Sequence, residues 1–149
     1  MMTWLRSLTG LLLAAIAVLV IGCSAPNVKV TTYTPEQLGG INTYATSVLA
    51  LRDRMPELET YIDQKDWVDV QYFIHGPLGE LRVRLDRLAR QLLPDTQDQA
   101  KTLAKDLYKH LVKIDEAADT RDTSLASSQY YEALSDFDAY LDLLPAANP

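Results

Sequence analysis

Cysteine, histidine and glycine are scarce in this chain of 149 residues, and each scarcity excludes a class of chemistry. The single cysteine, Cys23, allows neither an intrachain disulfide nor a CxxC motif. A di-iron helical bundle has glutamate three residues before histidine, but here Tyr72 precedes His75 and Leu107 precedes His110. The six glycines form no phosphate-binding loop, and no serine-histidine-aspartate pattern occurs. The residues therefore predict a protein that is not an enzyme and has no intrinsic cofactor.

Positive charge is also in short supply. Lysine and arginine number 14 against 20 aspartates and glutamates, which gives a net charge of −6 at pH 7. Arg6 is the only charged residue before Cys23, so the chain from Cys23 onward carries −7. Nucleic acid repels such an acidic chain unless its charges are strongly segregated, and we expect no nucleic-acid partner. With 48% hydrophobic and 23% charged residues, the composition is typical of one globular domain.

The longest hydrophobic run is too short to cross a membrane. It covers Leu8–Ile21, which is 14 residues, whereas a membrane-spanning helix needs ~20. A short run preceded by a basic residue is typical of a signal peptide, which we place at residues 1–22. The segment ends in Val20-Ile21-Gly22-Cys23. This pattern is similar to the bacterial lipobox, in which the cysteine sulfur receives diacylglycerol and the chain is cut just before it.

A lipid on Cys23 would explain why the chain has one thiol. Diacylglycerol together with an N-acyl chain provides the two or more chains that stable membrane anchoring needs. Residues 23–34 contain Pro26 and show no helical periodicity, so we interpret them as a lipidated flexible tether. Its eleven residues after the cysteine reach at most ~35–40 Å. The alternative is a soluble exported protein in which Cys23 has no special role.

Hydrophobic periodicity predicts four helices in residues 35–149 and no strand of useful length. We expect the third helix to start at Asp95 or Thr96 and the last to end at Pro145. Short polar turns join the helices, so neighbours should run antiparallel in an all-α, up-down-up-down four-helix bundle. The most regular apolar stripe belongs to the second helix: Trp67, Val70, Ile74, Leu78, Leu81, Leu85, Leu88 and Leu92.

Proline complicates the first helix. Thr34 and Gln37 form a capping box at its start, and Pro35 suits the first helical position. Pro56 then falls inside an apolar stripe that stays in phase across it. Because a proline inside a helix removes one hydrogen bond, we expect one kinked helix that continues to about Ile62, with two short helices as the alternative.

Gly76 and Pro77 interrupt the second stripe at its centre. Inside a helix, glycine costs ~1 and proline ~3 kcal/mol relative to alanine. Pro77 should also leave the carbonyl of Phe73 without its helical donor. One interpretation is a kink that fits the helix around its neighbours. The other is a shaped docking surface that offers Tyr72 and His75 to a partner.

Basic residues gather on the second and third helices. Two interpretations remain open: a solvated surface with intrahelical pairs such as Asp98–Lys101 and Arg82–Asp86, or electrostatic docking to an acidic protein, which salt would weaken. The lysines step by four along the third helix, and the arginines crowd the second: Lys101, Lys105, Lys109 and Lys113; Arg82, Arg84, Arg87 and Arg90.

Acidic residues suggest a second kind of function. His110 lies one turn from Asp106, and the last helix has two carboxylate pairs at one-turn spacing, Glu132 with Asp136 and Asp138 with Asp142. These pairs predict either a solvated acidic face or a weak surface site for a divalent cation, calcium or zinc. The alternative function is therefore a metal-binding, lipid-anchored protein that uses His75, His110 and these carboxylates.

Three stretches resemble the cyanobacterial PsbQ family, the CyanoQ proteins, over essentially the whole chain after the signal peptide. They are Lys65-Asp66-Trp67-Val68-Asp69, Tyr72-Phe73-Ile74-His75-Gly76-Pro77-Leu78-Gly79, and Asp136-Phe137-Asp138 followed by Tyr140-Leu141-Asp142-Leu143-Leu144-Pro145. The Lys101–Lys105 segment fits as well. The plant members are imported by a transit peptide, so Cys23 points to the bacterial branch.

This resemblance implies a non-catalytic, extrinsic subunit of photosystem II at the lumenal face of the thylakoid membrane. Such proteins bind the core beside the manganese-stabilising protein and the core antenna. They support assembly, stability and oxygen evolution, partly by helping to retain calcium and chloride at the manganese cluster. Carried over to this chain, the docking surface would include Trp67, His75, Gly76, Pro77 and Leu78. The turn and the basic ridge described above add Tyr72, Lys101, Lys105 and Lys109 to the predicted docking residues.

Overall fold

The computed structural model describes residues 32–146, in which every helix or strand assigned is an α-helix. The all-helical prediction is therefore confirmed for this part of the chain. The signal peptide, Cys23 and most of the tether lie outside the described residues. In chain order the helices are α2 (Pro35–Arg52), α3 (Met55–Gln64), α4 (Trp67–His75), α5 (Leu81–Ala89), α6 (Pro94–Thr120) and α7 (Thr123–Leu141).

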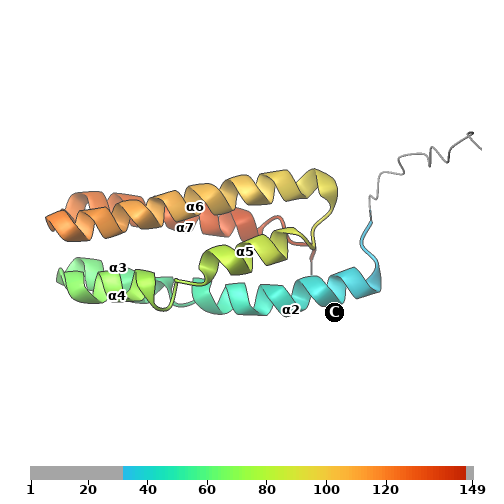
Figure 1. Cartoon of the computed structure of the whole chain (residues 1–149), viewed down its shortest axis with the longest axis horizontal. Coiled ribbons are helices and arrows are strands. Elements are labelled where there is room, and N and C mark those ends of the chain that lie inside the picture. Colours follow the sequence, from blue (N-terminus) through green and yellow to red (C-terminus); the bar gives the residue numbers. More distant parts are fainter. Residues whose placement is uncertain (1–31, 147–149) are drawn as a thin grey trace, which may run out of the picture.

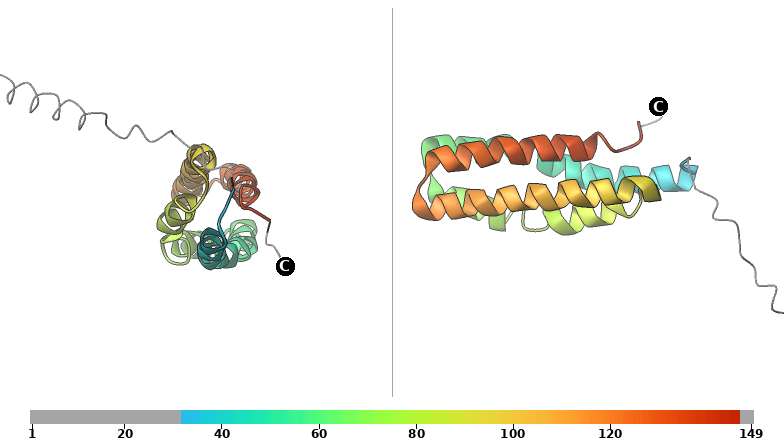
Figure 2. Two further views of the ribbon diagram at one scale, coloured as in Figure 1. Left: turned by 90° about the vertical axis from the view of Figure 1, so that its right-hand side faces the viewer. Right: turned by 90° about the horizontal axis from the view of Figure 1, so that it is seen from above.

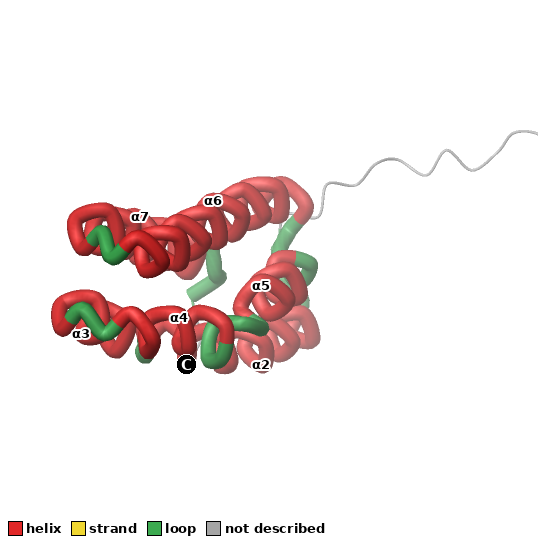
Figure 3. Tube along the Cα trace, turned by 60° about the vertical axis from the view of Figure 1, so that its left-hand side comes forward, coloured by secondary structure: helices red, strands yellow, loops and turns green. Residues whose placement is uncertain are grey.

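The helices pack side by side along one long axis (Figure 1, Figure 2). α2 and α3 follow one another along one edge, and α4 and α5 return beside α3 and α2. α6 then runs beside both α5 and α4, and α7 returns beside α6 and α3. Figure 3 shows the loops that divide the shorter helices. Among residues 32–146, no helix is long and apolar enough to cross a membrane.

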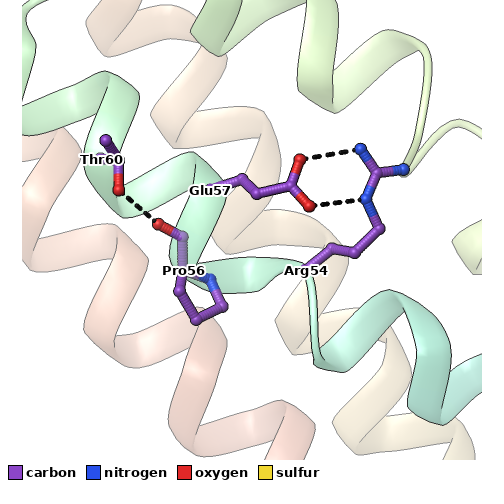
Figure 4. Close-up of polar contacts among 4 residues, drawn as sticks. All are labelled: Arg54, Pro56, Glu57 and Thr60. Carbon is purple, nitrogen blue, oxygen red and sulfur yellow. Dashed lines mark hydrogen bonds and ion pairs between the residues drawn. The ribbon is translucent and has the colours of Figure 1, made fainter.

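Pro56 divides the first predicted helix in two, so the expectation of one kinked helix is wrong. α2 ends at Arg52, and Pro56 stands in the first turn of α3, where its missing N–H is no loss. The Arg54 guanidinium donates two hydrogen bonds of 2.8 Å to the carboxylate of Glu57 across this start, and the Thr60 hydroxyl donates to the Pro56 carbonyl at 2.9 Å (Figure 4). The alternative of two short helices is the one observed.

The second predicted helix is interrupted, not merely kinked. Residues 76–80 form a turn between α4 and α5. Pro77 has no N–H to donate to Phe73, as expected, but the Phe73 carbonyl is not left unpaired, because the Leu78 N–H donates to it at 3.1 Å. Leu78 remains 3% exposed, so the stripe keeps its place in the core through the turn. A Cβ on Gly79 would lie only 2.4 Å from the His75 carbonyl oxygen, and the tight backbone here therefore requires glycine.

α6 and α7 form an unbroken hairpin. α6 begins at Pro94, one residue before the predicted start, with Leu93 as its N-cap. Arg121 ends it in the left-handed conformation, and the Asp122 carboxylate caps α7 by accepting from the Leu125 N–H at 3.0 Å. α7 ends at Leu141, four residues before Pro145. Arg121 and Asp122 are thus the only two residues between α6 and α7, and they are enough to reverse the direction of the chain.

The interior of the described region is entirely apolar by residue type. No polar or charged residue is buried there, and the largest fully buried side chains include Tyr130, Tyr140, Phe73 and Phe137. The Tyr140 hydroxyl donates to the Leu85 carbonyl at 2.6 Å, which ties α7 to α5. Tyr33, at the end of the predicted tether, packs on this core and its hydroxyl accepts from the Leu93 N–H at 3.3 Å. The prediction of a tether that extends through Tyr33 is therefore wrong at this residue.

Candidate docking surface

The three predicted docking lysines, Lys101, Lys105 and Lys109, all line a groove between α5 and α6. The groove has a volume of about 670 Å³. α5 turns its leucines inward and leaves Arg82, Val83 and Asp86 on the groove side, while α6 turns Leu107 inward. The residues that line it are Arg82, Val83, Asp86 and Ala89 from α5, and Lys101, Ala104, Lys105, Tyr108 and Lys109 from α6. We call this feature the α5–α6 groove.

The groove is lined by exposed apolar side chains and by cationic ones. We call Val83 and Tyr108 its floor, and Lys101, Lys105 and Lys109 its rim. Val83 is 49% and Tyr108 41% exposed, which is high for side chains of their size. Arg82 lies over the Tyr108 ring, with its guanidinium carbon 5.4 Å from the ring centroid. Within the region that the structure describes, Lys105 and Lys109 make no hydrogen bond or ion pair. Their charges are therefore available to a partner.

The other basic residues near the groove are largely neutralised by local carboxylates. Arg84 pairs with Glu80 at 2.9 Å. Lys101 pairs with Asp98 at 3.5 Å, which confirms the pair predicted from their spacing. The predicted pair of Arg82 with Asp86 is wrong, because Asp86 pairs with Arg90 and Arg82 stacks on Tyr108. These exposed pairs are worth little individually. They leave Lys105 and Lys109 as the groove lysines without a carboxylate partner among the described residues.

The turn at residues 76–80 borders the same face of the molecule. A second hollow, of about 230 Å³, is lined by His75, Leu78 and Gly79 on one side and by α6 residues including Tyr108 and Asp115 on the other. Tyr108 borders both hollows. The structure thus places His75 and the predicted lysines along one side of α6, although they are far apart in sequence.

Two hydrogen-bonded contacts hold α4 against α6 next to the turn. His75 Nε2 lies 3.0 Å from Asp115 Oδ1, and its side chain is 68% exposed. One turn earlier, Gln71 Nε2 donates to Asp119 Oδ1 at 2.8 Å. His75 is therefore engaged within the chain, yet its ring remains accessible.

Other predicted residues do not join this face. Trp67, at the start of α4, is half-buried against the core, and Leu78 is buried, so both shape the fold more than the surface. Tyr72 is 71% exposed but lies near Arg54, on the side of α4 toward the α2–α3 break. Gly76 and Pro77 form the turn itself.

Sequence reasoning named the lysines of the groove but not its floor. Val83 and Tyr108 were missed as docking residues, although both are apolar side chains among charged ones and outside the buried stripes. Such residues on amphipathic helices are the signal that could have identified them.

The acidic residues of α7 meet α6, not solvent alone. His110 Nδ1 lies 2.8 Å from Gln129 Oε1, and His110 Nε2 lies 3.5 Å from Asp136 Oδ2, so the suggested pair with Asp106 is replaced by contacts to α7. Asp136 Oδ2 is buried and accepts no hydrogen bond from the described residues. Burial raises the pKa of Asp136, and the nearby carboxylates of Asp106 and Glu132 act in the same direction. Among residues 32–146, no group of three metal-ligating side chains is present.

Comparisons with known proteins cover almost the whole chain. The family described as PsbQ, oxygen evolving enhancer protein 3, matches residues 5–145. The protein named CyanoQ from Synechocystis sp. strain PCC 6803 is 46% identical over 149 residues, which cover 99% of this chain and 100% of that protein. The matched region contains every helix described above and every predicted docking residue.

Proposed function

Because the chain belongs to the PsbQ family, we propose that it is a non-catalytic extrinsic subunit of photosystem II. In this role it supports the assembly and stability of the oxygen-evolving complex, and hence oxygen evolution, by docking to the core. Similarity to CyanoQ along the full length of both proteins is the observation that carries the proposal. The family's description as an oxygen evolving enhancer points the same way.

We also propose where the protein acts. The signal peptide and lipobox of the sequence support anchoring through a lipid on Cys23, at the lumenal face of the cyanobacterial thylakoid membrane. Two or more acyl chains on the mature N-terminus give stable attachment without a membrane-spanning helix. From this position its partners are the core antenna and the manganese-stabilising protein.

The fold supports a role carried out by surfaces. We propose that α2 with α3, α4 with α5, α6, and α7 form the four arms of an up-down-up-down bundle around the apolar interior of residues 32–146. Such an interior fixes the shape of the outer faces and provides no polar side chains for chemistry. The chain then contributes to oxygen evolution by holding its neighbours and by shielding the site where they retain ions.

Purification through an affinity tag tests this function. The tagged full chain, isolated from detergent-solubilised thylakoids, should bring down photosystem II core subunits together with the manganese-stabilising protein. A tagged Cys23→Ser variant should be released from intact membranes by high salt, while its circular dichroism remains that of wild type. Recovery of the tagged chain without photosystem II would contradict the proposal, and salt-resistant attachment of Cys23→Ser would contradict the anchor.

Calorimetric titration separates this function from the metal-binding alternative. We propose that any calcium or zinc bound by the surface carboxylates binds weakly, because exposed helical carboxylate pairs supply few ligands. Tight, stoichiometric binding that disappears in His75→Ala or His110→Ala would favour the alternative instead.

A further inference from the structure

We propose that the α5–α6 groove binds an acidic amphipathic helix of a partner protein. The carboxylates of that helix lie on Lys101, Lys105 and Lys109, and its apolar face contacts Val83 and Tyr108. The inference rests on the proposed function only in that the chain has a protein partner.

Charge is the first argument. The residues that line the groove include four basic ones, Arg82, Lys101, Lys105 and Lys109, and one acidic one, Asp86, although the whole chain has a net charge of −6. A positive groove on an acidic protein orients an acidic partner and repels a basic one.

Spacing is the second argument. Residues four apart on a helix are separated by ~6 Å along its axis, so the three lysines of the rim repeat over ~12 Å. Acidic residues at positions i, i+4 and i+8 of an incoming helix have the same repeat, and a helix laid along α6 can present one carboxylate to each ammonium group. The match requires no change in either helix.

The floor is the third argument, and it favours a protein helix over a lipid surface. Val83 and Tyr108 line the groove between the two helices beside its basic residues, and both are exposed to a partner there. A helix with leucines next to its acidic row can insert those side chains into the hollow, as in other helix-in-groove complexes. A flat headgroup layer can reach the rim but leaves the floor unfilled.

A designed peptide provides the probe. It is a helix with glutamates at i, i+4 and i+8 and leucines on the adjacent face, compared with a scrambled peptide of the same composition. Both are labelled with a fluorophore and titrated with the full chain in a non-ionic detergent. We expect the designed peptide to bind at least tenfold more tightly than the scrambled one, and more weakly as salt is raised.

Two double variants with the same charge change locate the site. Lys105→Gln with Lys109→Gln removes two charges from the rim. Lys65→Asn with Arg121→Asn removes two charges at the α3–α4 and α6–α7 turns. Both of these residues are in the left-handed conformation, which asparagine tolerates. The rim variant should lose at least tenfold in peptide affinity, and the turn variant less than twofold. Tyr108→Ala should also weaken binding, by removing part of the floor.

Equal losses in the two double variants, or equal binding of the two peptides, would overturn the proposal. So would binding to phosphatidylglycerol vesicles that depends on Lys105 and Lys109 in the absence of peptide binding, because the groove would then recognise a lipid surface. The tag purification distinguishes this failure from failure of the proposed function. If the rim variant still brings down photosystem II as wild type does, the groove is not the docking site although the function stands.

Discussion

The α6–α7 hairpin and the α2–α5 half of the molecule contribute to one core in different ways. α6 has 27 residues and α7 has 19 without a break, whereas α3, α4 and α5 have only 10, 9 and 9. Each interruption in the first half keeps its apolar residues in the core. Leu51 and Met55 are buried on the two sides of one break, as are Phe73 and Leu81 on the two sides of the other. The difference teaches that an interrupted helix can fill a core as fully as a continuous one, while its breaks shape the surface.

Stability should nevertheless be distributed unevenly. Continuous helices that pack along their full length open together, whereas short helices between turns can open locally. We therefore expect amide hydrogen exchange to be slowest in α6 and α7 and faster in α3 and α4. The two hollows border the less stable half, where small adjustments to a partner cost least.

The largest effect is expected from the core. Phe137→Ala in α7 and Phe73→Ala in α4 remove side chains that are 0% and 1% exposed, so each should lower the free energy of unfolding by about 3–5 kcal/mol. Hydrogen exchange then tests the comparison. Phe137→Ala should reduce protection throughout the chain, but Phe73→Ala mainly in α3 and α4. The same pattern of loss in both variants would show that the two halves do not differ.

An intermediate effect is expected in the turn between α4 and α5. Gly79→Ala places a Cβ against the His75 carbonyl oxygen, where backbone must shift, and should cost about 1–3 kcal/mol in urea unfolding. Gly39→Ala is the matched control. A Cβ there meets nothing within 4 Å, so the variant should gain up to about 1 kcal/mol from helix propensity. A neutral Gly79→Ala would mean that the turn is easily remodelled.

The smallest effect is expected within the hairpin, at Asp136, whose Oδ2 atom is buried. Because the pKa of Asp136 is raised in the folded chain, its contribution to stability is lost as pH rises through that pKa. Asp136→Asn should therefore raise the free energy of unfolding by about 1 kcal/mol at pH 8. The gain should become smaller as pH falls toward the raised pKa of Asp136, because a protonated carboxyl group is neutral as asparagine is.

The neighbouring carboxylate provides the contrast. Asp138 accepts two hydrogen bonds from Arg52, at 2.6 and 2.9 Å, so Asp138→Asn should lower stability slightly at pH 8. A loss of stability in Asp136→Asn at pH 8, measured by thermal unfolding, would show that its carboxylate is well solvated or paired.

Local signals in the sequence predicted much of the fold. The capping box of Thr34 and Gln37 is present as expected, with hydrogen bonds of 3.2 and 2.9 Å. Most residues of the second predicted stripe are buried, because packing follows helical periodicity. Trp67 and Ile74 are only partly buried, and the buried Phe73 was not in the stripe. The apolar stripes did not reveal the breaks. The apolar residues keep their helical spacing across Pro56, so the pattern gives no sign that α2 ends before it.

The candidate site was predicted only in part. Lys101, Lys105 and Lys109 form a row that one helix determines by itself, and this row could be seen in the sequence. The groove depends on the separation of α5 from α6, which packing across the whole core sets. The position of Arg82 over Tyr108 likewise depends on two helices, so the local rule that paired Arg82 with Asp86 gave the wrong partner.

Oxygen evolution tests the central proposal most directly. Photosystem II from cells that lack the chain should evolve oxygen more slowly than wild type at low calcium and chloride, and adding back the purified full chain should restore the rate. The rim variant Lys105→Gln with Lys109→Gln should restore less than the turn variant at equal concentration. A rate that is the same with and without the chain, at every calcium and chloride concentration, would contradict the account.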